Sequence, residues 1–462
     1  MFSIDCLKTN ENYQLFKADA EARISFAVTG LVTILRLLLV QKTHEISKKK
    51  ILFITSSEQN ALRYQNDFKK AFGMETSLLP FQNISMYESV ASNVYDYAEQ
   101  VKILREKPDI VIAPVKTLLE KFPASDFYEQ NKLTIKVGDE IDLKNLSQKL
   151  VNLGYKRSTM VSDIAEFSIR GDIADVFSLD KNPVRIELWG DEVVDLRYFD
   201  NETQKSVEKV KEIEILPIYK FLLDNPKGLP KEIKEQVDEE GYFEGIEVYQ
   251  NYFNKNLVSV LDYFKDYTVI FDETPEVYAK FEFTDENFTK QLQENLKLGL
   301  HYELDGLNHI TYEEFIQKLA CYIKIGLNKF LDGEMDEIIE FNTQPVKNFA
   351  ANFDEIAKFI TDNQHYRIII ATDYPERVKE ILKEREVYAD ITYTESIASH
   401  GGILEDFETI ILTDRELFNK RTKEVTSSKR SYYKEKPEFI ESINDIKEGE
   451  YVVHSILGVG IY

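Results

Sequence analysis

The chain has 462 residues, of which 43% are hydrophobic and 30% are charged, and its formal net charge is −24. This length and composition predict a globular chain of about three domains. Excess acidic charge repels the phosphate backbone of nucleic acids, so we expect protein partners and weak or no direct DNA binding, unless the acidity serves only solubility.

Cysteine content and apolar patterning predict a cytoplasmic chain without a membrane segment. Cys6 and Cys321 lie far apart, which argues against a disulfide framework and against a cysteine-rich zinc site. The N-terminus lacks a basic stretch followed by an apolar one, so we predict no signal peptide. The longest apolar run, 29–40, is too short to span a bilayer and contains Arg36, so we interpret it as a buried helix.

The first third alternates strand-like and helix-like segments, as parallel α/β sheets do. Residues 51–55 and 109–113 are short apolar runs typical of buried strands. Ser56 or Ser57 can cap a helix that ends near Gly73, and the stretch VKTLLEKF after the second strand predicts another helix.

The pattern changes near residue 132. A strand (LTIKV) and a helix (DLKNLSQKLVNLG) precede closely spaced strands separated by turn residues, which predicts a small α+β domain inserted into the first one. After residue 217 the chain is acidic and helical, with one clear strand at 267–271. From about residue 346 a second small α/β unit is predicted, and the basic stretch 420–436 is interpreted as a linker.

A nucleotide site is predicted to be degenerate. A P-loop needs a glycine-rich turn followed by Gly-Lys-Ser/Thr, because backbone N–H groups and the lysine hold the phosphates. None of the 18 glycines precedes a lysine, and only Gly30 occupies the turn where a P-loop is expected. Asp272 and Glu273 end a strand of the Walker B form, but without the P-loop groups they have no phosphate-bound metal to hold.

Other catalytic or metal-binding patterns are weak. The six histidines include no HExxH pair, Ser399-His400 lacks the surroundings of a nucleophile elbow, and His454 lies in a strand-like segment. We therefore expect no catalytic residues, no bound metal and no cofactor in this chain.

Three residues exceed what folding of the inserted domain requires. Arg170, Arg185 and Trp189 have the composition of a protein–protein hot spot, in which planar guanidinium groups meet carboxylates and a large ring fills a pocket. The alternative is that both arginines pair with local acids such as Asp172, Asp175 and Glu187 and that the indole is core. Composition alone favours this alternative, since most surface ion pairs carry little energy.

Residues 167–217 resemble the domain shared by the excision-repair protein UvrB and the transcription-repair coupling factors. The resemblance rests on IRGDIADVF, PVRIELWGDEV and LRYFDNETQ. In that family the domain offers the surface that binds UvrA, so the resemblance implies that Arg170, Arg185 and Trp189 contact UvrA. The tryptophan departs from the phenylalanine that is usual at this position.

The rest of the chain resembles the coupling factors more than UvrB. UvrB keeps a working P-loop and a long DNA-clamping hairpin, whereas here the P-loop is eroded and the stretch QNISMYES is short. The segment HGGILEDFETIILTDRELFNKR and the final residues resemble coupling-factor sequence beyond that module. This implies an α/β fold with a degenerate ATPase-like parallel sheet (1–125 and 218–345), an inserted UvrA-binding α+β domain (126–217), a small α/β domain (346–420), a linker (421–445) and the first strand of an RNA-polymerase-interacting domain (446–462).

The function implied is that of a repair adaptor, the N-terminal part of a coupling factor that recruits UvrA to RNA polymerase stalled at DNA lesions. ATP and Mg²⁺ would serve only the motor domains of a longer parent, an ATP-dependent DNA translocase that also binds RNA polymerase. The main alternative is a UvrB-type, ATP-dependent damage-recognition protein. A transcription-regulator module is a further alternative that rests only on the last residues.

Overall fold

The computed structural model describes residues 9–82, 94–179, 182–224, 226–300, 302, 308–330, 337–419, 451–454 and 458–461. The chain forms two compact units, Met1–Arg421 and Thr422–Tyr462. In the second unit, β23 (Tyr451–His454) and β24 (Gly458–Ile461) pair as an antiparallel hairpin. The prediction of a single strand within residues 446–462 was wrong. The predicted linker 421–445 lies outside the described residues.

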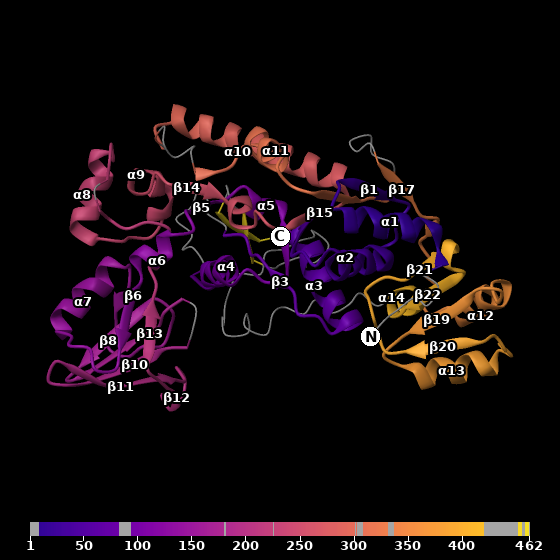
Figure 1. Cartoon of the computed structure of the whole chain (residues 1–462), viewed down its shortest axis with the longest axis horizontal. Coiled ribbons are helices and arrows are strands. Elements are labelled where there is room, and N and C mark those ends of the chain that lie inside the picture. The colour runs from indigo at the N-terminus through magenta and orange to yellow at the C-terminus, as the bar shows by residue number, and fades with distance from the viewer. Residues whose placement is uncertain are drawn as a thin grey trace. The chain divides into compact units, whose positions relative to one another are not determined.

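A seven-stranded sheet lies at the centre of the first unit (Figure 1). Its strands are, in spatial order, β17 (Ile338–Glu340), β1 (Phe26–Thr29), β16 (Lys324–Leu327), β15 (Thr268–Asp272), β2 (Ile51–Thr55), β4 (Ile110–Pro114) and β3 (Ser77–Leu78). Every neighbouring pair runs parallel. The central strands are buried along their whole length, as expected for a parallel sheet covered on both faces. The predicted parallel α/β sheet is thus confirmed.

Helices cover this sheet on both sides. They include α1 (Glu11–Ala22), α2 (Thr33–Ser47), α3 (Glu58–Phe72), α4 (Val94–Glu106), α10 (Thr274–Lys297) and α11 (Tyr312–Leu319). Ser57 caps α3, and Gly73 ends it with a φ of 64°, as predicted. The helix predicted for VKTLLEKF was wrong in its second half. Only α5 (Val115–Leu118) is helical, because β5 (Lys121–Pro123) pairs with β14 (Leu257–Ser259).

Between β4 and β15 the chain builds a six-stranded sheet, which Figure 1 shows beside α7. In spatial order its strands are β12 (Ser206–Val210), β11 (Glu192–Phe199), β10 (Val184–Trp189), β9 (Ile173–Val176), β8 (Glu166–Arg170) and β7 (Lys156–Arg157). The amphipathic helix α7 (Leu143–Asn152) contributes Leu146 and Leu150 to the core on the inner face. β6 (Leu133–Lys136) and β13 (Glu212–Ile215) pair beside it. Gly171 and Gly190 adopt positive φ angles in the tight turns that follow β8 and β10.

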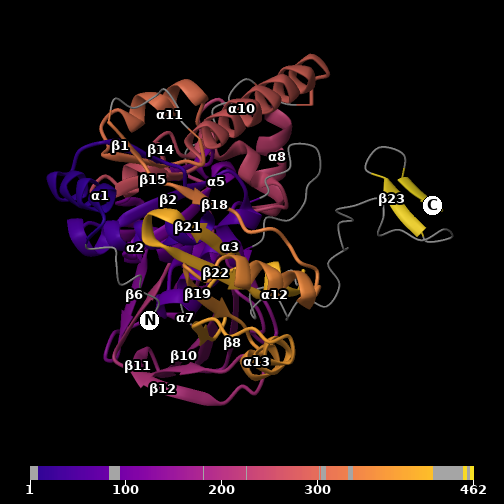
Figure 2. The ribbon, with the colours of Figure 1, turned by 90° about the vertical axis from the view of Figure 1, so that its right-hand side faces the viewer.

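A five-stranded sheet follows the seven-stranded one. Its strands are, in spatial order, β18 (Thr343–Gln344), β21 (Gly402–Leu404), β22 (Thr409–Thr413), β19 (Arg367–Ala371) and β20 (Ile391–Thr394). Helices α12 (Phe353–Asp362) and α13 (Pro375–Glu384) lie beside β19 and β22 in Figure 2 and share one core with them. The alternate side chains Ile369 and Ile411 belong instead to the core that contains α2.

The remaining described helices are short or exposed. They are α6 (Phe127–Asn131), α8 (Lys231–Glu240), α9 (Gln250–Phe253) and α14 (Asp414–Phe418). Within the described ranges, no helix combines the length and the apolar character needed to cross a membrane. The apolar run 29–40 is mostly the first half of α2, where four leucines are fully buried.

Candidate functional site

The outer face of the six-stranded sheet carries the three hot-spot candidates. Along β10, Val184, Ile186 and Leu188 point into the core, so the alternate residues Arg185 and Trp189 point outward. Strand register then places Asp175 of β9 directly beside Arg185. In β8, Ser168 pairs with Asp175. Arg170, two residues further along the strand, therefore lies on the same face. The fold thus brings all three predicted residues onto one surface.

Asp175 joins the two arginines. Its side chain is 0% exposed and accepts hydrogen bonds from Arg170 Nη2 at 3.0 Å, from Arg185 Nε at 2.7 Å and from Arg185 Nη2 at 2.8 Å. The hydrogen bonds that Arg185 donates to Asp175 have the largest influence on the pKa of Arg185 and raise it. Both arginines therefore have a local acidic partner, as the alternative interpretation of the sequence expected.

The two arginines differ in exposure. The side chain of Arg185 is 17% exposed, and its guanidinium lies 4.7 Å from the ring centroid of the buried Phe199. The side chain of Arg170 is 52% exposed. Arg185 is therefore wedged between Asp175 and an aromatic ring, whereas much of Arg170 faces solvent.

Trp189 lies at the end of β10 and is 82% exposed. The interpretation of its indole as core is wrong. The alternation along β10 was the signal that could have placed it outside. A large exposed ring on the same sheet face as a partly exposed arginine is the composition expected at the centre of a protein interface.

Further charges on this face are paired with one another. Arg197, across from Arg185 on β11, donates to Glu187 at 2.7 Å and also pairs with Asp195. Lys209 of β12 donates to Asp195 at 2.8 Å. Arg197 and Lys209 thus balance the charges of Glu187 and Asp195.

The second candidate site lies where β1 leads into α2. Gly30 has a φ of 73°, and a Cβ atom there would lie 1.8 Å from the carbonyl oxygen of Phe341. Thr343 Oγ1 accepts the backbone N–H of Val32 at 3.0 Å and also bonds the carbonyl of Gly30. Groups from residues 341–343 therefore occupy the space next to the start of α2, where a P-loop would hold phosphate.

Arg36 of α2 is buried close to this turn. It lies at the position where a P-loop counted from Gly30 has its lysine. Arg36 Nη1 donates to Asp272 Oδ1 at 2.9 Å, and Nη2 bonds Glu273 and the carbonyl of Leu31. The hydroxyl of Tyr64 donates to Asp272 at 2.7 Å. Sequence reasoning found Gly30, Asp272 and Glu273 but missed Arg36, although its spacing from Gly30 was available.

Electrostatics favour the charged form of Arg36. Burial lowers its pKa, but Tyr64, Asp272 and Glu273 raise it by more, so the net pKa lies above the ordinary value. Burial, followed by Asp272, raises the pKa of the Tyr64 hydroxyl, which therefore stays protonated. The two carboxylates thus interact with a permanent internal cation.

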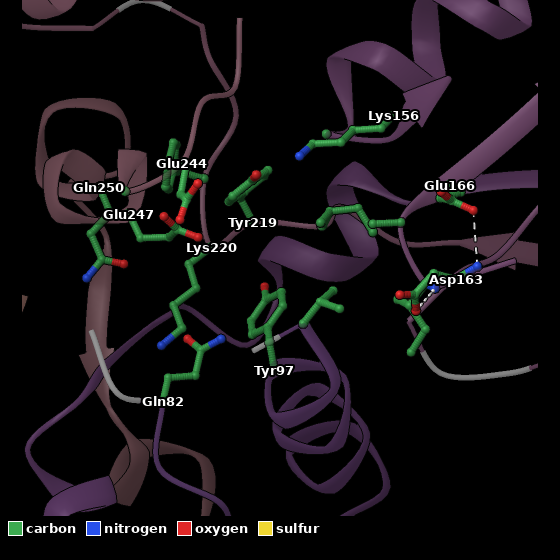
Figure 3. Close-up of a pocket in the computed structure, with 17 residues that line it drawn as sticks. Gln82, Tyr97, Lys156, Asp163, Glu166, Tyr219, Lys220, Glu244, Glu247 and Gln250 are labelled. Atoms are coloured by element: carbon green, nitrogen blue, oxygen red, sulfur yellow. Dashed lines mark hydrogen bonds between the residues drawn. The ribbon is translucent and has the colours of Figure 1, made fainter. Parts of the chain in front are cut away.

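A third feature is a cavity of about 310 Å³ between residues 154–166 and 218–250 (Figure 3). In Figure 3, Lys220, Gln82 and Gln250 line one side and Asp163 and Glu166 the opposite side. Lys220 is buried and donates to Glu120 at 3.0 Å. The lining carries charges of both signs, and we assign this cavity no ligand.

Ser399 and His400 have a structural use in the fold. Ser399 donates to Asp67 from its backbone N–H at 2.9 Å and from its hydroxyl at 2.7 Å. Its hydroxyl also lies 2.9 Å from Nδ1 of His400, whose pKa burial lowers to about 3. These contacts join α3 to the segment before β21.

The side chain of His454 lies outside the described residues. In the described ranges, no cluster of at least three His, Cys, Asp or Glu residues could bind a metal ion.

Asp67 predicts a measurable pH dependence of stability. Burial raises its pKa to about 6, against the opposing hydrogen bonds from Ser399, whereas the unfolded chain keeps a value of about 3.9. The folded state therefore holds the proton more tightly. The stability that folding gains from this tighter proton binding is fully present below about pH 4 and is lost as the pH rises through about 6. We expect Asp67 to account for about 2 kcal/mol of lost unfolding free energy between pH 4 and pH 7.

Urea unfolding of the wild type and of Asp67→Asn from pH 4 to pH 7 measures this effect. Asn can still accept from Ser399, so the variant should gain stability relative to the wild type as the pH rises. The exposed Asp109→Asn serves as a control. A constant difference between wild type and Asp67→Asn across this range would contradict the prediction.

Comparisons with known proteins found one matching domain model and similar proteins. Residues 133–221, which include the three hot-spot candidates, match the family model described as UvrB interaction domain. The chain is 25% identical over 94% of its length to a transcription-repair-coupling factor of Staphylococcus aureus. It is 26% identical over 99% of its length to one of Staphylococcus haemolyticus. The chain spans 41% and 43% of the lengths of these two relatives.

Proposed function

We propose that this chain is a DNA-repair adaptor that binds the repair protein UvrA. Its similarity to transcription-repair-coupling factors along nearly its whole length, and the match of residues 133–221 to the UvrB interaction domain model, support this proposal. In a longer parent protein, this binding recruits UvrA to RNA polymerase stalled at a lesion. The parent's contact with RNA polymerase and its ATP-driven movement on DNA belong to the same proposal.

One observation carries the proposal. Within the matched domain, Trp189 is 82% exposed on the same sheet face as the partly exposed Arg170. Burying a ring of this size against a partner removes apolar surface from water, and a guanidinium can bind a partner carboxylate beside it. Both side chains belong to this chain itself, so we expect UvrA binding to occur without ATP, DNA or RNA polymerase.

Binding is tested with the purified chain and purified UvrA by calorimetry. We expect a dissociation constant in the micromolar range or below, about −8 kcal/mol or stronger. The double variant Arg170→Ala, Trp189→Ala should lose this binding, whereas Arg197→Ala, on the same face, should not. Equal binding by the wild type and the double variant would exclude the proposed surface.

The Gly30–Arg36 region supports the proposal that the nucleotide site is degenerate. Arg36 pairs with both Asp272 and Glu273, and Thr343 accepts the backbone N–H of Val32 near the start of α2, where a P-loop would bind phosphate. We therefore predict no ATP hydrolysis and nucleotide binding weaker than about 1 mM, or about −4 kcal/mol.

Calorimetry with ATP and Mg²⁺ measures this prediction. Arg36→Lys is an informative control, because it restores a lysine without the second glycine and the Ser/Thr of a P-loop, and we expect it to remain unable to bind. Micromolar binding by the wild type that disappears in Asp272→Asn would instead favour the UvrB-type, ATP-dependent alternative.

A further inference from the structure

Asp175 is a carboxylate that a partner cannot touch. Its side chain is 0% exposed, yet it accepts hydrogen bonds from both arginines of the proposed UvrA-binding face. A buried carboxylate is costly unless it is paired, so Asp175 and the two guanidinium groups hold one another in place.

The hydrogen bonds to Asp175 leave the two arginines with different numbers of N–H donors for a partner. Arg185 gives both Nε and Nη2 to Asp175 and lies over the ring of Phe199. A guanidinium that already uses one edge in this way has fewer N–H groups for a second carboxylate. Arg170 gives Asp175 only a hydrogen bond from Nη2 and is 52% exposed, so most of its donors face outward.

We propose that Asp175 is a positioning residue for the partner-binding face, an inference that rests on the proposed function. It fixes Arg185 as a support and holds Arg170 with its free donors directed to the partner. One carboxylate with two guanidinium groups leaves a single positive charge at this point. The matching site on the partner is therefore a carboxylate beside an apolar pocket that accepts the indole of Trp189.

The test is a double-mutant cycle measured by UvrA binding. Asp175→Asn keeps the shape of the side chain but removes its charge. We expect it to weaken UvrA binding about tenfold, as Arg170→Ala does, since a lost charge-assisted contact costs about 1–2 kcal/mol. The double variant Asp175→Asn, Arg170→Ala should bind no more weakly than Arg170→Ala alone, because both changes remove the same contact. By contrast, the effects of Arg170→Ala and Trp189→Ala should largely add.

Asp195→Asn is the matched control. Asp195 lies on the same face, loses the same charge, and pairs with Arg197 and Lys209 rather than with Arg170. It should bind UvrA as the wild type does, and the melting temperatures of all variants show whether they fold. If Asp175→Asn does not fold, Arg185→Lys replaces it. This change keeps the charge but loses the two-point contact, and it should show the same non-additivity with Arg170→Ala.

The possible results distinguish failure of the positioning role from failure of the proposed function. Wild-type affinity in folded Asp175→Asn, or fully additive effects of Asp175→Asn and Arg170→Ala, would overturn the positioning role. An equal loss in Asp195→Asn would also overturn it, because charge alone would then explain the effect. Absence of UvrA binding by the wild type would instead overturn the proposed function.

Discussion

Arg36→Ala is expected to lower the free energy of unfolding by about 3–5 kcal/mol, the cost of removing one partner from a buried ion pair. The change leaves Asp272 with only the Tyr64 hydroxyl as a side-chain donor among the hydrogen bonds described above, and it frees Glu273 from its cation. Urea unfolding at neutral pH measures the loss. Arg36 links the segment after β1, through the carbonyl of Leu31, to Asp272 at the end of β15, so the change removes contacts between these two parts of the fold.

The double variant Arg36→Met, Asp272→Asn separates charge from packing. It removes the cation and one of its carboxylates together, and Met fills part of the space left by the arginine stem. We expect it to recover at least half of the loss seen in Arg36→Ala. A loss below about 1 kcal/mol in Arg36→Ala would place this pair among weak surface bridges and contradict its structural role.

The hot-spot residues are expected to separate into two groups. Arg170→Ala and Trp189→Ala should each weaken UvrA binding by about 1–4 kcal/mol, the range of interface hot spots, while the melting temperature changes little. Arg185→Ala should destabilise the fold by about 2–4 kcal/mol, because it leaves the buried Asp175 with a single partner. Calorimetric titration with UvrA and thermal unfolding of the same three variants provide both readouts.

Phe199→Leu is a useful companion to this series. It keeps an apolar side chain under Arg185 but removes the ring against which the guanidinium lies. A modest loss of stability without loss of UvrA binding is expected, because Phe199 is buried. If Arg185→Ala kept wild-type stability and lost binding, Arg185 would be a direct contact and the division between the two arginines would be wrong.

Local pattern was sufficient for many elements of the fold. Residues 51–55 and the TIILT run of β22 could be predicted as strands because they are mostly apolar, and the structure buries every side chain in them. The bounds of α3 follow from Ser57 and Gly73, which act on the adjacent backbone. The pairing of β5 with β14 could not be predicted, because it joins Phe122 to Val258 and depends on residues far along the chain.

The same division between local and distant information applies to the candidate sites. The outward position of Trp189 was contained in the alternation of β10, although the residue type suggested core. The contact of Arg36 with Asp272 joins residues 236 positions apart, so spacing from Gly30 could suggest the cation but not its partner. The resemblance of the 167–217 segment identified the three surface residues, while their hydrogen bonds through Asp175 required the structure.

The shared core of α2 and the five-stranded sheet has a consequence for how the chain folds as it is made. The leucines of α2 leave the ribosome hundreds of residues before Ile369 and Ile411, which belong to the same core. Contacts so distant in sequence slow folding, and apolar surface exposed in the interval favours aggregation. Gly402, which is also made late, packs against Val32 so closely that a Cβ atom at this position would lie 2.7 Å from the Val32 side chain. Nascent chains halted before residue 370 should therefore depend on chaperones, whereas those that extend past residue 419 can cover α2 themselves.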